Sequence, residues 1–417
     1  MKKRNILLLF VICILAISVI TGLLVYAFHL QNIEDLNSQS ARKRLQNTTN
    51  EKDADKLTLA PVKPDVSTAP AKADTKPSLP PAQITVTPTS APNGQNASSK
   101  PIVLGFAGDV NLDEKSYPAA KYDLEKKNIK GCFSGDLLGE MNNADIMMLN
   151  NEFAYSTRGV KTPDKSFTFR ANPDRVKILQ KMGVDIVSLA NNHALDYGRD
   201  ALLDTFDTLK GADISYIGAG DNLTEAKAPV YYTINGKKIA FVAASRVVFS
   251  MNWYATDNSP GMVGTYDPAL IIESIKEAKA NSEFVVMFVH WGIERKNYPT
   301  EYQRSLAQQY IDAGADAVVG CHPHVMQGFE YYKGKPIAYS LGNFWFNRAT
   351  EKSALLKLYL SPDGTVKMQL LPAATKNTFA YLLTKKTEIK NYFDFIRKIS
   401  FDVAIDENGY ITPTNRN

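Results

Sequence analysis

Cysteine and histidine are scarce in this chain of 417 residues, which has only three cysteines and five histidines. Cys13 falls in an apolar N-terminal run, and Cys132 and Cys321 are far apart in the sequence, with no C-x-x-C spacing. The cysteines therefore argue against a disulfide framework and against a zinc-finger site. Because histidine is so rare, the position of each one along the chain is informative.

A dense basic stripe is also missing. The net charge is +5, but Lys and Arg are interspersed with Asp and Glu along the chain. Nucleic-acid-binding domains gather basic residues on one face, so we expect no nucleic-acid partner. The small positive excess is compatible with an anionic partner.

The N-terminus predicts a membrane anchor. The uncharged segment Ile6–Phe28 exceeds the roughly 20 residues that a membrane-spanning helix needs. It is longer than the apolar region of a cleaved signal peptide, which is the alternative. Positive residues at 2–4 indicate a cytoplasmic N-terminus. We therefore predict a cytoplasmic tip and signal anchor over 1–30, a single pass through the cell membrane, and an extracytoplasmic main domain at the cell surface.

The next segment predicts a spacer. Residues 31–100 are polar, and from residue 61 they are rich in Pro, Ala, Thr and Lys. Such a composition buries too little apolar surface to offset the entropy of ordering the chain. We expect a disordered, semi-stiff linker.

From residue 101 onward, apolar strand-like runs alternate with helical patterns. Residues 172–183 have helical spacing, with an N-cap Asn followed by Pro and a final Gly. The strand-like run 184–189 follows, and Asn235-Gly236 joins two further strands as a hairpin. This alternation predicts an α/β domain with mixed sheets over 101–380, followed by a C-terminal extension, 381–417.

Four histidines directly follow strand-like runs, and several acidic and amide residues have the same position. Ligands of α/β sheets bind beyond the carboxyl ends of the strands. Carboxylate, amide and imidazole donors suit Mn, Fe or Zn, and this set is large enough for two ions. A lone histidine at a strand end is more often structural, and Asp109 could instead cap a turn. The collected set is Asp109, Glu152, Asn192, His193, His290, His322 and His324.

Six motifs then identify a family. In order, they are GFAGDVNLD, NNEFAYS, SLANNHALDYG, FVHWGIE, GADAVVGCHPHVMQGFE and YSLGNFWF, within residues 101–346. They resemble the poly-gamma-glutamate capsule-biosynthesis family of the CapA type, which is similar to the calcineurin-like metallophosphatase superfamily. The resemblance implies a four-layer α/β/β/α sandwich with mixed sheets and a dinuclear metal centre.

The resemblance also implies a role for each donor. Asp109 and His324 would bind the first metal, and Glu152 would bridge the two ions. Asn192, His290 and His322 would bind the second metal. His193 would be catalytic, steadying the substrate or protonating the leaving group.

Two positions depart from the superfamily pattern. Asn111 stands where the superfamily has a histidine ligand, and Glu152 replaces a shorter Asp. The first site is one strong ligand short, unless Asn111 or Asp113 completes it. The expected cofactor is therefore one or two divalent ions.

Together these features predict a membrane-anchored, extracytoplasmic protein of capsule poly-gamma-glutamate biosynthesis or export, with a metal-dependent, phosphoesterase-like site. Its partners would be an anionic polymer or a phosphoester, and membrane synthase subunits. Arg170, Arg246 and Trp291 are predicted substrate contacts, although surface ion pairs and core packing are the commoner roles of such residues. The alternatives are a non-catalytic polymer-binding or assembly subunit and a metal-dependent hydrolase of another cell-surface polymer.

Overall fold

The computed structural model describes residues 100–414. The predicted membrane anchor and nearly all of the predicted linker lie outside the described residues. Within 100–414, no helix combines the length and the apolar character that crossing a membrane requires.

The larger of two main sheets has ten strands and mixes parallel with antiparallel pairs. Its order is β19-β20-β17-β16-β1-β2-β5-β6, with β15 beside β1 and β18 beside β17. Strands β1, β2, β5 and β6 run parallel to one another. The strands are β1 (Ile102–Val110), β2 (Ile146–Asn151), β5 (Ile186–Ser188), β6 (Ser215–Ile217), β15 (Asn343–Trp345), β16 (Thr350–Leu360), β17 (Val366–Lys376), β18 (Phe379–Leu382), β19 (Val403–Ile405) and β20 (Tyr410–Pro413).

The smaller main sheet has six strands in the order β13-β14-β12-β11-β9-β8. These are β8 (Val230–Ile234), β9 (Lys237–Ser245), β11 (Phe284–His290), β12 (Ala317–Cys321), β13 (Phe329–Tyr332) and β14 (Lys335–Ala338). Two small pairs lie outside both sheets: β3 (Ala154–Tyr155) with β4 (Arg170–Ala171), and β7 (Ala219–Gly220) with β10 (Gly261–Met262).

The helix predicted over 172–183 begins and ends where its local sequence signals indicate. The pattern over 172–183 forms a 3-10 turn, Pro173–Arg175, capped by the Asn172 side chain, and then α4. Gly183 ends α4 with φ 74°, a left-handed conformation that glycine adopts without strain. The α-helices are α2 (Tyr117–Leu124), α3 (Gly135–Asn142), α4 (Val176–Met182), α5 (Gly198–Lys210), α6 (Leu223–Lys227), α7 (Ala269–Ala280), α8 (Glu301–Ala313) and α9 (Lys386–Ile399).

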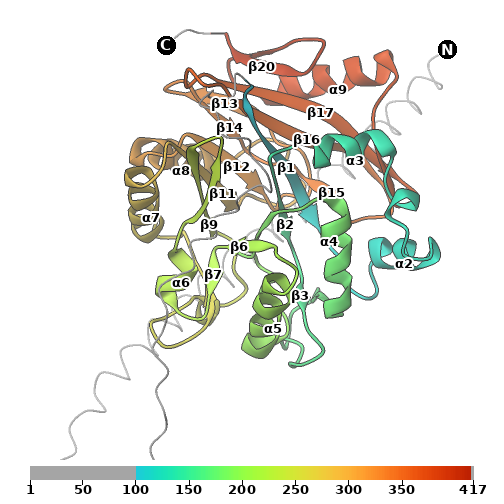
Figure 1. Cartoon of the computed structure of the whole chain (residues 1–417), viewed down its shortest axis with the longest axis vertical. Helices are drawn as coiled ribbons and strands as arrows, with labels where there is room; N and C mark the ends of the chain where they lie inside the picture. The colour runs from blue at the N-terminus through green and yellow to red at the C-terminus, as the bar shows by residue number, and fades with distance from the viewer. Residues whose placement is uncertain (1–99, 415–417) are drawn as a thin grey trace, which may run out of the picture. The chain divides into compact units, whose positions relative to one another are not determined.

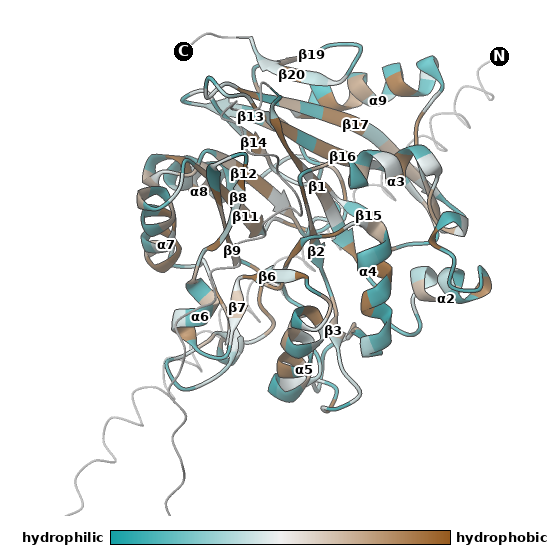
Figure 2. Ribbon diagram, in the orientation of Figure 1, coloured by the Kyte–Doolittle hydropathy of each residue, from teal (hydrophilic) through white to brown (hydrophobic). Residues whose placement is uncertain are grey.

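The two main sheets pack face to face, and helices cover their outer faces (Figure 1). Successive strand residues point to opposite faces, and β11 illustrates this. Val286 and Phe288 lie in the core between the sheets, whereas Val285 and Met287 pack under α7 and α8. Figure 2 agrees with this arrangement, because hydrophobic residues are concentrated on the central strands. The fold is a mixed α/β fold with several sheets.

The C-terminal segment belongs to this same core. Strand β20 pairs with β17 in the large sheet, and β19 pairs with β20. Phe393 and Ile396 of α9, together with Ile411, are buried between the sheets. The predicted boundary at residue 380 therefore does not mark the end of the folded core, which continues through β20.

Candidate metal centre

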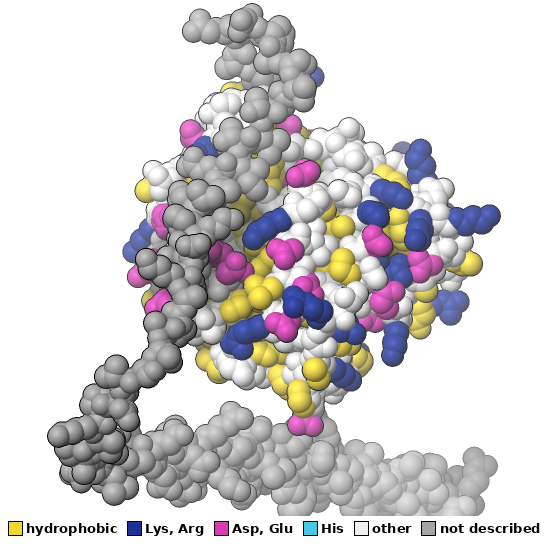
Figure 3. All heavy atoms as spheres, turned by 60° about the horizontal axis from the view of Figure 1, so that its bottom comes forward, with side chains coloured by type: hydrophobic (Ala, Val, Ile, Leu, Met, Phe, Trp, Pro, Cys, Tyr) yellow, Lys and Arg dark blue, Asp and Glu magenta, His cyan; other side chains and the backbone are white. Residues whose placement is uncertain are grey.

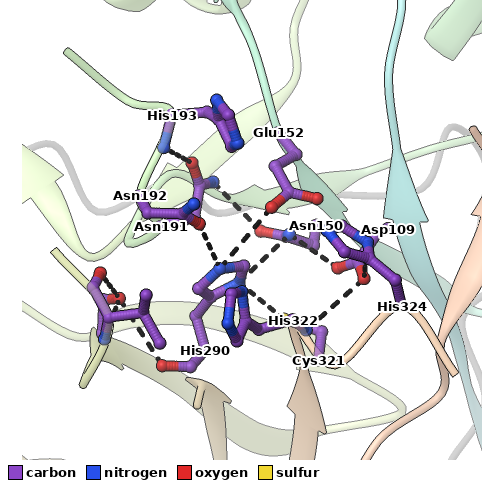
Figure 4. A network of polar contacts seen from close by, with 12 residues as sticks. Asp109, Asn150, Glu152, Asn191, Asn192, His193, His290, Cys321, His322 and His324 are labelled. Atoms are coloured by element: carbon purple, nitrogen blue, oxygen red, sulfur yellow. Dashed lines mark hydrogen bonds and ion pairs between the residues drawn. The ribbon is translucent and has the colours of Figure 1, made fainter. Parts of the chain in front are cut away.

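The predicted donors meet at the carboxyl ends of β1, β2, β11 and β12 and in the turn after β5 (Figure 4). Inner-face residues at these strand ends point into the layer between the sheets. Asp109 and Asn150 lie side by side on β1 and β2, and His290 lies beside Cys321 on β11 and β12. The two sheets thus bring together side chains that are far apart in sequence, such as those of Asp109 and His324.

The donor atoms lie close to one another. His290 Nε2 is 2.7 Å from Asn192 Oδ1 and 3.6 Å from Glu152 Oε1. His324 Nδ1 is 3.3 Å from Asp109 Oδ2 and 2.8 Å from Asn343 Oδ1. This spacing places several oxygen and nitrogen donors within reach of a common ion.

Glu152 gives the sharpest indication that a ligand is needed. Its side chain is 0% exposed, and neither carboxylate oxygen has a hydrogen-bond partner among the described residues. The Nδ1 atom of His322 is also buried without a partner. Burying such groups unpaired costs free energy, so native proteins almost always satisfy them. A divalent cation between these residues would satisfy both, and the residues present therefore fit the expected metal.

The electrostatics agree with a site built for a cation. Burial and the Asp109 carboxylate raise the pKa of Glu152 well above its ordinary value. Burial and the neighbouring His322 and His324 lower the pKa of His290 well below its ordinary value. Burial opposes the charge of His324 as well, but Glu152 and Asp109 raise its pKa to about 10. Carboxylates and imidazoles bind metal ions in their deprotonated forms. An ion here would therefore displace protons from groups with a raised pKa, such as Glu152 and His324.

The backbone around the histidine pair is strained. His322 has φ 100° and His324 has φ 59°, on either side of Pro323. Residues other than glycine rarely adopt positive φ, and such conformations persist where the surrounding structure holds them for a function. The strain directs both imidazoles into the site.

Two sets of donors are compact enough to hold an ion. In each set the ligand atoms all lie within 4.8 Å of one another. One set is Asp109, His290 and Cys321, and the other is Glu152, His322 and His324. Cys321 was not among the predicted ligands, because its spacing from the other cysteines is not that of a metal site, although it lies in the same motif as the histidine pair.

Asn150 and Asn191 are among the amide residues at strand ends, but the predicted ligand set did not include them. The Asn150 amide donates to Asp109 Oδ1 at 2.8 Å, and Asn191 donates to Asn150 Oδ1 at 3.1 Å. Asn191 also accepts the backbone N–H of His193 at 3.0 Å. This chain of amides fixes the turn after β5 against β2, which explains why the turn carries two adjacent asparagines. Their position at strand ends was the available signal.

His193 is positioned by a buried ion pair. Its Nδ1 lies 2.7 Å from Asp196 Oδ2, and Asp196 also accepts a hydrogen bond from Lys165 at 2.5 Å. The His193 ring packs against Phe169, with ring centroids 4.3 Å apart. Burial lowers the pKa of His193, against the opposing effect of Asp196. With Nδ1 occupied by Asp196, the second ring nitrogen is left for another partner.

Asn111 and Asp113, the possible additional ligands, make local hydrogen bonds. Asn111 Oδ1 accepts the backbone N–H of Asp113 at 2.8 Å. Asp113 accepts the backbone N–H groups of Lys115 and Arg170. These bonds shape the turn after β1, and the Asp113 carboxylate belongs to neither of the two compact donor sets among the described residues.

The predicted substrate contacts Arg170 and Arg246 have other partners. The Arg170 guanidinium donates to the carbonyl of Arg158 and lies 4.1 Å from the Tyr197 ring centroid. Arg246 donates to backbone carbonyls at residues 265–266 and stacks on two tyrosines. Both arginines are thus held by the loops around the site.

Trp291 does not fit its predicted role. It follows His290 directly and therefore points to the opposite face of the sheet. Its side chain is fully buried under α7 and α8, and its indole N–H donates to the Tyr339 carbonyl. Trp291 is a packing residue, which was the alternative that the sequence left open.

The fold and site define a mixed α/β protein with a buried cluster of candidate metal ligands. Residues 103–348 match the model of the family described as "Bacterial capsule synthesis protein PGA_cap". The match spans more than half of the chain, which therefore belongs to this poly-gamma-glutamate capsule-biosynthesis family of the CapA type.

Curated relatives carry related names. The chain is 38% identical over 216 residues to "Capsule biosynthesis protein CapA" of Bacillus anthracis, covering 50% of this chain and 52% of the relative. It is 38% identical over 219 residues to "PGA biosynthesis protein CapA" of Bacillus subtilis, covering 52% and 57%. A "Probable polyglutamine synthesis accessory protein" of Mycobacterium tuberculosis is 30% identical over 260 residues, covering 57% and 68%. The chain thus spans little more than half the length of the two Bacillus relatives.

Solved structures show weaker likeness. A hypothetical protein from Thermus thermophilus aligns with a TM-score of 0.38 and 16% identity, covering 65% of this chain and 99% of that one. A 5'-nucleotidase from Candida albicans aligns with a TM-score of 0.37 and 11% identity, covering 67% and 53%.

Proposed function

We propose that this protein is a membrane-anchored, extracytoplasmic component of poly-gamma-glutamate capsule synthesis or export. In this proposal its fold is metallophosphatase-like, and its site is a metal-dependent hydrolase of the phosphoesterase type. Family membership supports the capsule role, since two relatives are named for capsule or PGA biosynthesis. The anchor over residues 1–30 and the linker that follows would hold the folded domain outside the membrane.

One observation carries the hydrolytic part of the proposal: Glu152 is buried beside imidazoles, and neither carboxylate oxygen has a hydrogen-bond partner among the described residues. A structural carboxylate in a core would have hydrogen-bond donors around it. Glu152 instead lies close to His290, His322 and His324, with which it would hold a divalent ion. Asp109, Asn192, His290, His322 and His324 would hold the ions with it.

Divalent ions held in this way supply Lewis-acid activation of water and of the scissile group. The protein's own contribution is positioning. The strained His322–His324 turn and the amide chain through Asn150 fix the donors before substrate arrives. Such preorganisation avoids rearrangement during the reaction.

His193 would handle the proton of the leaving group. Asp196 holds its Nδ1, so the opposite nitrogen can donate to an oxygen of the substrate. An anionic substrate beside the ring favours the charged imidazolium, which offsets the effect of burial. This role is general acid catalysis, which typically contributes about 10²- to 10⁴-fold to a rate.

The test combines metal analysis with turnover by the purified full-length chain. We expect bound transition metal and hydrolysis of bis(p-nitrophenyl) phosphate or of poly-gamma-glutamate. His193→Ala should lower the rate about 100-fold or more while the bound metal is retained. His29→Ala, which changes a histidine of the predicted membrane edge, is the matched control and should leave the rate unchanged.

A second function is favoured by one observation. Asn111 replaces an expected ligand, and its side-chain oxygen accepts a hydrogen bond from the Asp113 backbone N–H within a turn. The first metal site would therefore be weaker. A protein with one ion would bind an anionic polymer or assemble a synthase without turnover. Unchanged polymer affinity in His193→Ala, with no hydrolysis by the unmodified chain, would support this function. Hydrolysis of a different cell-surface polymer would instead show that the substrate is not poly-gamma-glutamate.

A further inference from the structure

We propose that Cys321 is a metal ligand, and that Cys321, His290 and Asp109 form the softer half of the metal centre. This inference rests on the metal centre of the proposed function. It adds a thiolate to a donor set that the resemblance describes as carboxylate, amide and imidazole. It also predicts which ions the centre prefers.

The topology places Cys321 in the site. β11 and β12 are parallel neighbours, and His290 is paired directly with Cys321. Both residues are the last of their strands, and both face the layer between the sheets. Asp109 lies opposite, on the facing sheet, and its Oδ2 also lies 3.4 Å from the backbone N of the next residue, His322. Three chain segments thus converge on one position (Figure 4).

The distances suit a shared ion. Cys321 Sγ is 3.3 Å from His290 Nδ1. Bonds of about 2.3 Å to sulfur and about 2.05 Å to nitrogen place two tetrahedral ligands roughly 3.5 Å apart. The Asp109 oxygen lies within 4.8 Å of both atoms. The contact of the sulfur with the Val289 carbonyl is longer, at 3.8 Å.

His290 stands between the two halves of the centre. Its Nε2 faces Asn192 and Glu152, and its Nδ1 faces Cys321 and the Asn150 amide. One imidazole can therefore border both ion positions. In the competing account, Nδ1 only exchanges a hydrogen bond with the thiol or with Asn150, and the sulfur never meets an ion.

The chemistry of ligation is simple. The thiol loses its proton to solvent as the sulfur–metal bond forms, and no oxidant or reductant takes part. Thiolate is a soft ligand that favours Zn²⁺ or Co²⁺ over Mn²⁺ and Mg²⁺. Cys321 therefore biases the centre towards the softer ions, compared with a site of oxygen and nitrogen donors alone.

The experiment uses Co²⁺ as a probe with the full-length chain. Co²⁺ bound to a thiolate shows near-ultraviolet charge-transfer absorption, which Co²⁺ bound only to oxygen and nitrogen lacks. We expect this band on titration with Co²⁺, and we expect its loss in Cys321→Ser. The double variant Cys13→Ser/Cys132→Ser keeps Cys321 as the only cysteine and should keep the band. In competition, Cys321→Ser should lose more affinity for Zn²⁺ than for Mn²⁺.

The outcomes separate this inference from the proposed function. Bound Co²⁺ without the band in the unmodified chain overturns the role of Cys321 but leaves the metal centre intact. No bound Co²⁺ overturns both. The band in the double variant Cys13→Ser/Cys132→Ser, without any hydrolysis, confirms Cys321 as a ligand and contradicts only the enzymatic assignment. Circular dichroism of each variant verifies folding. The spectrum of the double variant, in which Cys321 is the only cysteine, decides the question even if Cys321→Ser fails to fold.

Discussion

At the scale of single residues, the site includes buried polar groups that have no hydrogen-bond partner among the described residues. Glu152 is the extreme case, because both oxygens of its buried carboxyl group lack such a partner. Sequence patterns located Asp109, Glu152 and the four histidines of the site because each lies at or shortly after the end of a strand. They could not locate Lys165, because its contact with Asp196 joins positions 31 residues apart and no local pattern marks it.

Glu152→Gln tests the role of the buried carboxylate. Mn²⁺ or Zn²⁺ at about 100 times its dissociation constant should stabilise the unmodified chain by about 2.7 kcal/mol. Glu152→Gln should lose most of this stabilisation, because the carboxylate that would hold the ion is gone. Thermal unfolding with and without metal measures the effect. Glu407→Gln, an exposed substitution, is the control, and an equal metal response in Glu152→Gln would contradict the assignment.

Lys165→Met tests the ion pair behind His193. The side chains of Lys165 and Asp196 are 8% and 0% exposed, so removing the lysine leaves a buried carboxylate without its cation. Breaking such a pair costs about 3 kcal/mol or more. Urea unfolding should show this loss. A change below about 1 kcal/mol would mean that His193 and the Phe169 amide satisfy Asp196 without the lysine.

At the scale of helices and strands, local sequence signals explain some elements, and contacts between distant segments explain others. The hairpin at Asn235-Gly236 is confirmed, and both residues have positive φ, as a tight two-residue turn requires. Helix α4 and strand β5 also lie where the sequence predicts. The placement of β20 and α9 in the core could not be predicted, because no local pattern marks it. Strand β20 is placed by its pairing with β17, and α9 by the packing of its apolar residues in the core.

Arg175 links elements of the helical layer, and its contribution should depend on pH. It pairs with Glu114 and Asp123 and thereby lowers the pKa of both carboxyls from their ordinary values of 4.5 and 3.8. When the pKa of a carboxyl is lower in the folded state, the ion pair adds to the free energy of unfolding at pH values above the ordinary pKa. This contribution is lost as the pH falls through the pKa of the folded state. Arg175→Gln should therefore destabilise the chain by about 1 kcal/mol at pH 7, since both carboxylates are nearly half exposed.

The Arg175 effect should fade on acidification. Urea unfolding at pH 7 and at pH values below the ordinary pKa of both carboxyls gives the comparison. Lys177→Gln removes an exposed pair on the same helix and should change little at either pH. A loss in Arg175→Gln that stays constant down to the lowest pH would show that packing of the side chain, rather than charge, is responsible.

At the scale of the whole molecule, a predicted membrane anchor would hold the folded domain at the membrane. The face in Figure 3 carries basic and acidic side chains interspersed, with hydrophobic ones between them. This mixture agrees with the sequence, in which no single-sign stripe occurs. On the face shown, recognition of an anionic polymer would therefore not depend on charge of a single sign.

The predicted topology can be checked in cells. We expect the full-length chain in the membrane fraction, with its main domain cleaved by protease added to intact, wall-stripped cells. A variant with charged residues placed in Ile6–Phe28 should lose membrane association, because each charge near the centre of a membrane helix costs about 2.5–3.5 kcal/mol. Recovery of the unmodified chain in the soluble cytoplasmic fraction would contradict the anchor.

Anomalous X-ray diffraction from Zn²⁺-loaded crystals of the chain would show whether the buried donors share a bound cation. We expect a zinc peak about 2.0–2.3 Å from donors among Asp109, Glu152, His290, Cys321, His322 and His324. Zinc found only at surface positions, with Glu152 still buried beside no ion, would contradict this expectation.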